Sequence, residues 1–429
     1  MKIGIQQKVL EDVVTKGSIA ALSEEAQADT STLSLLIKSV KITVDSKSIT
    51  VESGTSTLAI KYTIPVNEEN GIIVKEEGSV LVPAKELLNW VSLQGDSNIS
   101  LSLQKFSTPE IINMLGDNDF GDQKEYDSSK FTIKKIGTIK LISKSTSKTN
   151  KKWEIDCYEP TDFATVDFNK KADKCFEIQG NQFIEAISAV SFAAKKKDPE
   201  HVLDGISMQY YNEGMYFCAT DDTRLAVYII DKDMISNIDS TRRLLVPAIL
   251  FGQILKILDK EAKITISYNE EIGRVFIAQN NLKVRLANTD KEHVNKFPNI
   301  KMLIDKEYSK LVEMPKAVLN DLLINTALVN NSSARFAFNK TDSNLIIMAI
   351  SENDKYKPAY AQAPMNNISK DISLILGVST ILDGLKVIKS NEIHISVPAS
   401  QLSVKITGKD ISNFYYFCPT INNDKYKKE

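Results

Sequence analysis

Few residues of this chain have the types and spacing that chemistry on a substrate requires. The three histidines, His201, His293 and His394, lie far apart in the sequence. The H-E-x-x-H zinc motif, the G-x-x-x-x-G-K-[ST] phosphate loop, the G-x-S-x-G nucleophile motif and the G-x-G-x-x-G dinucleotide motif are all missing from the sequence. We therefore expect no catalytic residues, no metal and no cofactor.

The best metal candidate by residue type is the adjacent pair Asp221 and Asp222. Neighbouring side chains of an extended segment point to opposite faces, so these two carboxylates would not share an ion. Thr220 and Thr223 flank the pair, and all four residues favour turns, so a turn is the preferred interpretation. His394 lies in an alternating apolar and polar segment, and we expect an outward-facing strand residue rather than a ligand.

Cysteine spacing and the N-terminal segment bear on the compartment. The four cysteines are far apart, with no C-x-x-C pair, at Cys157, Cys175, Cys218 and Cys418. Free, mostly buried thiols in a reducing compartment are the simplest interpretation. Residues 1–20 have neither a long apolar core nor a small-residue cleavage site, and no apolar run approaches the ~20 residues of a membrane span. We expect a cytoplasmic protein without a membrane partner.

Length and composition limit the class of protein. The chain has 429 residues, of which 42% are hydrophobic and 25% charged. These values allow several domains and exclude disordered, collagen-like and disulfide-miniprotein classes. Lys and Arg number 53 against 55 Asp and Glu, so bulk charge neither requires nor excludes nucleic-acid binding. Arginines are few, which disfavours dense base-edge readout.

The elements that must position these residues recur along the chain. One segment type, a strand followed by Leu-Val-Pro-Ala and an apolar helix, occurs at 80–91 and 244–258. A weaker third copy at 375–388 has Ile-Leu-Gly-Val-Ser-Thr in place of that start, where Ser379 or Thr380 could cap the helix. A short alternating strand follows each helix, at 99–103, 264–268 and 393–397. A second type, a strand and a helix with apolar positions at i, i+3 and i+4, lies upstream of each, at 3–14, 176–187 and 312–323.

These repeats predict an α+β chain with three copies of one unit. The expected domains are 1–172, 173–306 and 307–429. The first copy is longer by a polar stretch, about 104–151, which we interpret as an insertion in a hairpin. Its acidic cluster at 116–122 resembles a calcium loop, but the downstream Glu spacing fails, and a solvated loop is expected.

Lysines are frequent on the predicted helices. If repeated sheets curve and close with the helices on the inside, the lysines would form a basic inner face suited to non-specific phosphate contact. Composition alone favours the simpler alternative that lysine is a good solvated helix residue. The candidate DNA-facing residues are Lys8, Lys16, Lys85, Lys195, Lys196, Lys197, Lys256 and Lys316.

Leu-Asp-Gly-Ile at 203–206 and Ala-Thr-Asp-Asp-Thr-Arg-Leu-Ala at 219–226 are similar to the middle-domain signature of the bacterial replicative sliding clamps, the beta subunits of DNA polymerase III. Val-Pro-Ala at 82–84, Val-Pro at 246–247, Phe-Pro-Asn at 297–299 and Tyr-Tyr-Phe-Cys-Pro at 415–419 match further family segments. The resemblance covers nearly the whole chain.

The resemblance implies a fold and a function. Three topologically similar clamp domains, with antiparallel sheets outside and helices inside, would form a head-to-tail homodimeric ring around double-stranded DNA. The ring would have no chemistry of its own and would tether polymerase for DNA replication. The implied partners are the DNA polymerase III alpha subunit, a clamp loader and other clamp-binding repair proteins.

The resemblance also implies two protein-binding surfaces. A partner-peptide pocket between the second and third domains would be lined by Leu203, Thr220, Arg224, Leu225, Pro247, Phe251, Val378, Ser379, Tyr416, Cys418 and Pro419. At the ring interface, Trp153 and Ile155 would meet Leu328 and Val329 of the other chain. Ordinary core packing is the alternative for most of these positions.

The sequence departs from the family around the pocket. Asp222 and Thr223 replace Gly-His of the signature, and Cys418 and Thr420 replace the usual methionines. A tail at 422–429 follows, and an acidic Glu at position 200 would disfavour acidic peptide side chains. We expect an altered peptide preference.

Three other classes of protein remain open as alternatives. The first is a non-enzymatic triplicated repeat protein that binds other macromolecules, for example at a cell surface. The second is a DNA-processing enzyme. The third is a trimeric clamp with two domains per chain, against which the three repeats argue.

Overall fold

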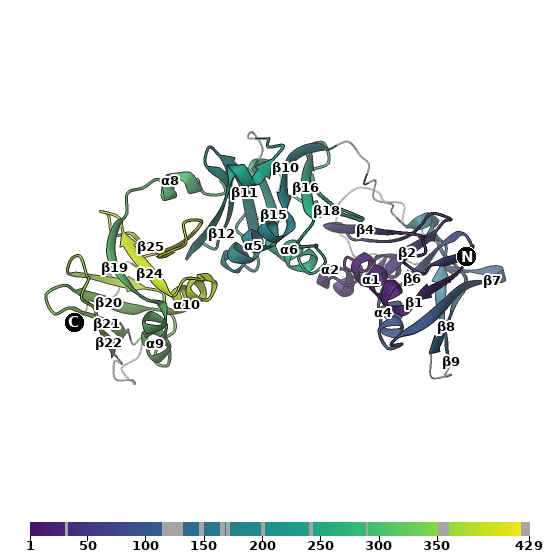
Figure 1. Cartoon of the computed structure of the whole chain (residues 1–429), viewed down its shortest axis with the longest axis horizontal. Helices are drawn as coiled ribbons and strands as arrows, with labels where there is room; N and C mark the ends of the chain where they lie inside the picture. Colours follow the sequence, from purple (N-terminus) through teal and green to yellow (C-terminus); the bar gives the residue numbers. More distant parts are fainter. Residues whose placement is uncertain are drawn as a thin grey trace. The chain divides into compact units, whose positions relative to one another are not determined.

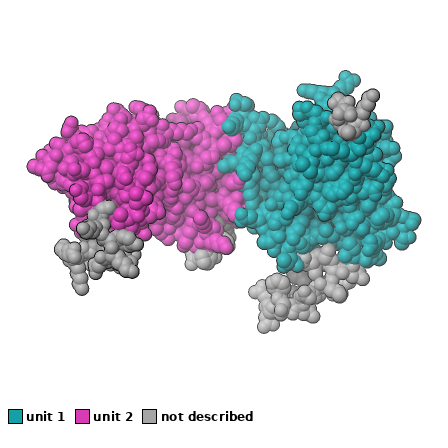
Figure 2. Space-filling view, turned by 90° about the horizontal axis from the view of Figure 1, so that it is seen from below, with its two compact units in different colours: residues 1–174, 253–287 teal, residues 175–252, 288–429 magenta. Residues whose placement is uncertain are grey.

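A computed structural model describes residues 1–30, 33–113, 132–145, 150–163, 168, 172–198, 202–239, 243–288, 291–350 and 360–421, and Figure 1 shows the course of the chain. The chain divides into two compact units (Figure 2). Unit 1 comprises Met1–Lys174 and Gln253–Ala287, and unit 2 comprises Cys175–Gly252 and Asn288–Glu429. The division into domains at 1–172, 173–306 and 307–429 stays a prediction.

Unit 1 is built on an antiparallel sheet. Its strands, in order across the sheet, are β16 (Lys263–Asn269), β17 (Arg274–Gln279), β18 (Leu282–Ala287), β4 (Leu58–Pro65), β3 (Ser48–Gly54), β2 (Ser39–Val44), β6 (Gly78–Pro83), β9 (Asn150–Tyr158), β8 (Thr132–Ser145), β7 (Ser97–Asn113), β1 (Lys2–Gln6) and β5 (Ile73–Glu76). Its helices are α1 (Gln7–Gly17), α2 (Glu24–Ala28), α3 (Ser34–Ile37) and α4 (Ala84–Ser92), with a 3₁₀ turn at Pro160–Asp162. The pairing of β18 with β4 joins residues more than 200 positions apart in the sequence.

Helices α1 and α4 lie side by side against this sheet (Figure 1). Leu10, Val13 and Val14 of α1 are buried, as their i, i+3, i+4 spacing predicts. A Cβ at Gly17 would lie 2.4 Å from Val51 Cγ1, so only glycine lets the end of α1 approach β3 this closely. The core contains buried residues of α1, α4 and the inner faces of the strands.

The described residues of the polar stretch at 104–151 lie in strands. β7 and β8 form a long antiparallel pair that extends to Asn113 and Thr132. The acidic cluster at 116–122 lies outside the described residues, as do 146–149.

Unit 2 contains an eight-stranded sheet, a four-stranded sheet and a strand pair. The eight-stranded sheet has the order β15 (Arg243–Pro247), β11 (Gly205–Tyr211), β12 (Gly214–Thr220), β13 (Leu225–Asp231), β26 (Phe414–Pro419), β25 (Ser403–Gly408), β24 (Glu392–Val397) and β19 (Ser309–Pro315). The four-stranded sheet has the order β22 (Tyr360–Pro364), β21 (Asn344–Ala349), β20 (Ala334–Asn339) and β23 (Ile372–Leu376), and β10 (Asp173–Gln179) pairs with β14 (Ile235–Ser236). The helices are α5 (Gly180–Val190), α6 (Ala248–Ile254), α7 (Lys291–Lys296), α8 (Ile300–Ile304), α9 (Lys316–Ala327) and α10 (Val378–Val387), with 3₁₀ turns at Ser191–Ala193 and Lys232–Met234.

The predicted strand-then-helix units are confirmed as elements. β6 ends at Pro83 and β15 at Pro247, and α4 and α6 begin at the next residue. β7, β16 and β24 contain the three alternating strands expected after the helices. The helix expected to continue to 258 ends at Ile254, because the Ile257 N–H bonds the Ile254 carbonyl in a tighter turn. The expected α+β class with antiparallel sheets is confirmed.

All four cysteines are buried and none forms a disulfide bond, as expected. Within the described ranges, no helix is both long and apolar enough to cross a membrane.

Candidate functional site

The segment between β12 and β13 is a turn closed by its own polar side chains. The Thr220 hydroxyl donates to the Arg224 carbonyl at 2.6 Å, and the Thr223 N–H and hydroxyl donate to the Asp221 carboxylate at 3.0 and 2.7 Å. Asp222 is exposed and has a φ of 73°, in the left-handed region where glycine costs least. The predicted turn is confirmed, and Asp222 occupies the position in it that requires a left-handed backbone conformation.

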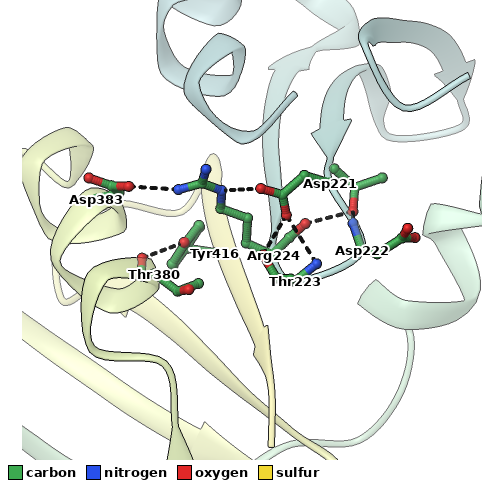
Figure 3. A network of polar contacts seen from close by, with 8 residues as sticks. Asp221, Asp222, Thr223, Arg224, Thr380, Asp383 and Tyr416 are labelled. Carbon is green, nitrogen blue, oxygen red and sulfur yellow. Dashed lines mark hydrogen bonds and ion pairs between the residues drawn. The ribbon is translucent and has the colours of Figure 1, made fainter. Parts of the chain in front are cut away.

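Arg224 joins this turn to helix α10 (Figure 3). Its Nε donates to Asp221 at 2.8 Å and one terminal nitrogen donates to Asp383 at 2.7 Å. The guanidinium also lies 5.7 Å from the ring centroid of Phe192. Burial raises the pKa of Asp383, but hydrogen bonds from Lys386 and Arg224 outweigh it and leave the pKa below the usual value. The arginine is therefore held by two carboxylates and one ring.

Tyr416 of β26 forms the second connection to α10. Its hydroxyl donates to the Thr380 carbonyl at 2.6 Å, and its ring is fully buried, 5.7 Å from that of Phe192. A Cβ at Gly384 would lie 2.3 Å from Tyr416 Cε1, so the helix and the ring touch only because residue 384 is glycine. Figure 3 shows the Tyr416 and Arg224 side chains close together between β26, the turn and α10.

The pairing of β13 with β26 brings most candidate pocket residues into one region of unit 2. Leu225 lies opposite Phe417 in this pair, and Val404 of β25 lies opposite Cys418. Of the candidates, Thr220, Leu225, Phe251, Val378, Tyr416 and Cys418 are buried, Leu203, Arg224, Pro247 and Ser379 are half-buried, and Pro419 is exposed. The turn, β26 and the start of α10 therefore meet around Arg224.

Phe251 packs in the core of unit 2, which was the alternative to a position in the wall of the peptide pocket. Its ring is fully buried and lies 5.8 Å from that of Phe183, which in turn contacts Phe217 edge-on. Asp383 and Phe192, which hold Arg224, were not among the candidates. No local pattern marks them, since Asp383 is 159 residues from Arg224.

The candidate DNA-facing lysines differ in solvent exposure and in whether their ammonium groups already have partners within the chain. Lys8 is exposed and paired with Asp96 at 2.9 Å. Lys16 is half-buried, with Nζ 2.7 Å from Asp12 and 3.2 Å from the Tyr62 hydroxyl. Burial lowers the pKa of Lys16, but these two partners raise it above its usual value. Lys16 thus stays protonated, and its charge is balanced by Asp12 within the same unit.

The other lysines are mostly solvent-facing. Lys85, Lys195, Lys196, Lys197 and Lys256 are exposed. Lys316, at the start of α9, is half-buried and donates to the Ile388 carbonyl at 2.6 Å.

The four candidate interface residues have contrasting exposures. Trp153 of β9 is 36% exposed and stacks on Trp90, with ring centroids 6.5 Å apart. Ile155 is 1% exposed and packs in the core of unit 1, which is the intrachain alternative. Leu328, just after α9, is 82% exposed, and Val329 is half-buried.

The structure describes the side chain of one histidine, His394. Residue 201 and the side chain of residue 293 lie outside the described part of the structure, together with position 200 and the tail at 422–429. His394 lies in a strand as expected, with Nε2 3.0 Å from Glu313. Among the described residues, no group of three or more His, Cys, Asp or Glu side chains is arranged to hold a metal ion.

Comparisons with known sequences find similarity to sliding clamps over parts of the chain. A family model described as the central domain of the DNA polymerase III beta subunit matches residues 177–293. The beta sliding clamp of Haemophilus influenzae is 23% identical over 254 residues, 58% of this chain and just under two thirds (66%) of that protein. The beta sliding clamp homolog GriR of Streptomyces muensis is 23% identical over 364 residues, 84% of this chain and 85% of that one.

Solved structures show the same fold. The DnaN sliding clamp of Pseudomonas aeruginosa bound to griselimycin has a TM-score of 0.76 and 16% identity, covering 98% of this chain and 99% of that one. The DNA polymerase III beta subunit of Thermotoga maritima has a TM-score of 0.73 and 18% identity over the same shares.

Proposed function

We propose that this chain is a member of the family of bacterial DNA polymerase III beta subunits, the sliding clamps, and that it encircles duplex DNA and tethers the replicative polymerase for processive DNA replication. Members of the family are processivity factors without a catalytic site. The observation that carries the proposal is the match to the family's central domain at 177–293, placed within a clamp fold that spans 98% of the chain. We also place the protein in the cytoplasm, where bacterial chromosomes are copied.

The proposed assembly is a head-to-tail homodimer whose three domains per chain close a ring. Heterologous contacts of this kind must close or else form filaments. Trp153 would meet Leu328 and Val329 of the second copy, whereas Ile155, which is only 1% exposed, would take part only through the strand that it shares with Trp153. The high exposure of Leu328 and the partial exposure of Trp153 support this pairing, since apolar side chains of this size favour burial.

The proposed contact with DNA is sequence-independent. Lysine charges at helix surfaces would neutralise phosphates without reading bases. The exposed Lys85, Lys196, Lys197 and Lys256 are better placed for this than Lys16 and Lys316, whose ammonium groups are already bonded within the chain.

The proposed peptide pocket centres on Arg224, Tyr416 and the start of α10. Peptides of the polymerase alpha subunit, the clamp loader and repair proteins would dock there. Two features support an altered peptide preference. The Arg224 guanidinium is already bound by Asp221 and Asp383, and the side chain of Tyr416 fills the space against α10. A peptide carboxylate would have to compete with both aspartates.

The test is mass in solution by light scattering, followed by retention on circular and linearised DNA after loading by a clamp loader. We expect a dimer that stays on circles and is lost from linear ends. A monomer with salt-sensitive binding that is equal on both DNA forms would contradict the ring and favour a different macromolecular binding role.

A further inference from the structure

A hollow of about 510 Å³ lies on one face of the eight-stranded sheet, over β19, β24, β25 and β26. The register places three of its side chains on that face, because Lys310 lies opposite Ser396 and Ser396 lies opposite Lys405. Tyr308 and Tyr415 line its side. The volume falls in the range of about 300–1,000 Å³ that is typical of ligand pockets.

This hollow is distinct from the region around Arg224. Lys405 lies opposite Phe417 in the sheet, and successive residues of a strand face opposite sides, so Tyr416 points to the other face. Tyr416 contacts α10 on that other face. The two sites therefore use opposite sides of β26, and evidence for one does not depend on the other.

The ammonium of Lys405 is the central feature of the hollow. Its Nζ lies 4.7 Å from the ring centroid of Tyr308 and 5.9 Å from that of Tyr415. The side chain is half-buried, and this burial lowers the pKa of Lys405. Within the described part of the chain, no carboxylate forms an ion pair with Lys405. A cation that has lost part of its hydration without gaining a counter-ion favours an incoming anion.

The surrounding charges attract a carboxylate but not a long polyanion. Lys409, Lys310 and His394 all converge on one carboxylate, Glu313, at 2.6, 3.1 and 3.0 Å. Hydrogen bonds from these groups, that of Lys409 foremost, lower the pKa of Glu313 to about 2, so it stays ionised. Asp410 also lines the hollow. The lysines outnumber the two acids, yet both acids would repel a neighbouring row of phosphates.

We propose that this hollow is a binding site for an acidic peptide segment, with Lys405 pairing with a peptide carboxylate between the rings of Tyr308 and Tyr415. The two rings supply apolar walls for the methylene stem of a Glu or Asp side chain, and Lys310 and Lys409 also line the hollow. This site extends the partner surface of the protein beyond the pocket at Arg224.

The test uses the full chain and a fluorescein-labelled nonapeptide that carries one Glu residue among Ser and Tyr residues, compared with its Gln counterpart by fluorescence anisotropy. We expect the Glu peptide to bind and Lys405→Gln to weaken its binding about tenfold, as for loss of one charge-assisted hydrogen bond. Lys370→Gln, which removes an exposed lysine of the same unit outside the hollow, should leave binding unchanged.

A second measurement covers the case in which Lys405→Gln does not fold. Reductive methylation of the unmodified protein, read by mass spectrometry, should label Lys405 less when the Glu peptide is present and label Lys370 equally. Equal labelling of Lys405 with and without the peptide would contradict the site.

Three binding results would overturn the proposal. The first is equal affinity for the Glu and Gln peptides. The second is tighter binding of a labelled twelve-nucleotide oligo-dT that is lost in Lys405→Gln, which would assign the hollow to single-stranded nucleic acid. The third is full displacement of the peptide by an equal concentration of inorganic phosphate, which would leave only a small-anion site.

Discussion

At the scale of single residues, Arg224 determines how the β12–β13 turn is joined to helix α10. Its side chain is 19% exposed and forms ion pairs with two aspartates, Asp221 and Asp383. Asp383→Asn removes one of them, while Asp383 itself is 37% exposed, so solvent screens part of the interaction. We expect a loss of about 0.5–1 kcal/mol, seen as a lower Tm in calorimetry. Asp321→Asn, an exposed aspartate of α9, is the matched control.

The same pair predicts a pH dependence. Folding lowers the pKa of Asp383 below its ordinary 3.8. The stabilising contribution of the ion pair between Asp383 and Arg224 is therefore complete above that value. It is lost as the pH falls through the pKa of Asp383 in the folded protein. The Tm difference between the unmodified protein and Asp383→Asn should be constant near neutral pH and vanish at strongly acidic pH. A difference that grows on acidification would have the wrong sign.

The cysteines allow a second residue-scale prediction. Burial raises the pKa of Cys157 and of Cys418 to about 12 and also raises that of Cys218. Thiolate is the reactive form, so the native protein should react slowly with a thiol reagent such as DTNB at pH 8. All four thiols should react at once in guanidinium chloride. Rapid stoichiometric labelling of the native protein would show that these side chains are accessible.

At the scale of elements, the contact of α10 with β26 depends on one missing Cβ. Gly384→Ala would place a methyl group 2.3 Å from the buried ring of Tyr416, and neither the helix nor the ring has free space. We expect destabilisation of about 1–3 kcal/mol, measured as a fall in Tm.

The helix α6 supplies a matched control for that substitution. At Gly252 no atom lies within 4 Å of the added Cβ, so Gly252→Ala should instead stabilise by about 0.5–1 kcal/mol through helix propensity. If both variants lowered the Tm equally, the contact between Gly384 and Tyr416 would not be the cause. If Tyr416→Leu restored the Tm in the Gly384→Ala background, the contact between the added methyl group and the Tyr416 ring would be shown to cause the destabilisation.

At the scale of the whole molecule, the proposed ring makes the exposure of Leu328 a requirement for assembly. Leu328→Glu would place a charge in an apolar interface, and we expect the mass in solution to fall to that of one 47.8 kDa chain. Retention on circular DNA should be lost with it. Met302→Glu, at another exposed apolar side chain of unit 2 (72% exposed), should leave both unchanged. A Leu328→Glu protein that remains dimeric would exclude this surface from the interface.

The sequence by itself determined the local elements, because their signals are periodic and short-range. Apolar spacing predicted α1 and α5, Pro83 and Pro247 marked the starts of α4 and α6, and the polar residues at 220–223 predicted the turn. The motif pattern also indicated the family. These features are encoded within a few residues of one another.

Only the tertiary structure decided which distant segments meet. β4 pairs with β18, β13 pairs with β26, and Arg224 reaches Asp383 across 159 residues. No local pattern specifies these pairings, because each depends on how whole sheets align and pack. The same reason explains why the sequence could not predict that Ile155 and Phe251 are fully buried. It also explains why the sequence could not predict that Lys405 lies near two tyrosine rings without a carboxylate partner among the described residues.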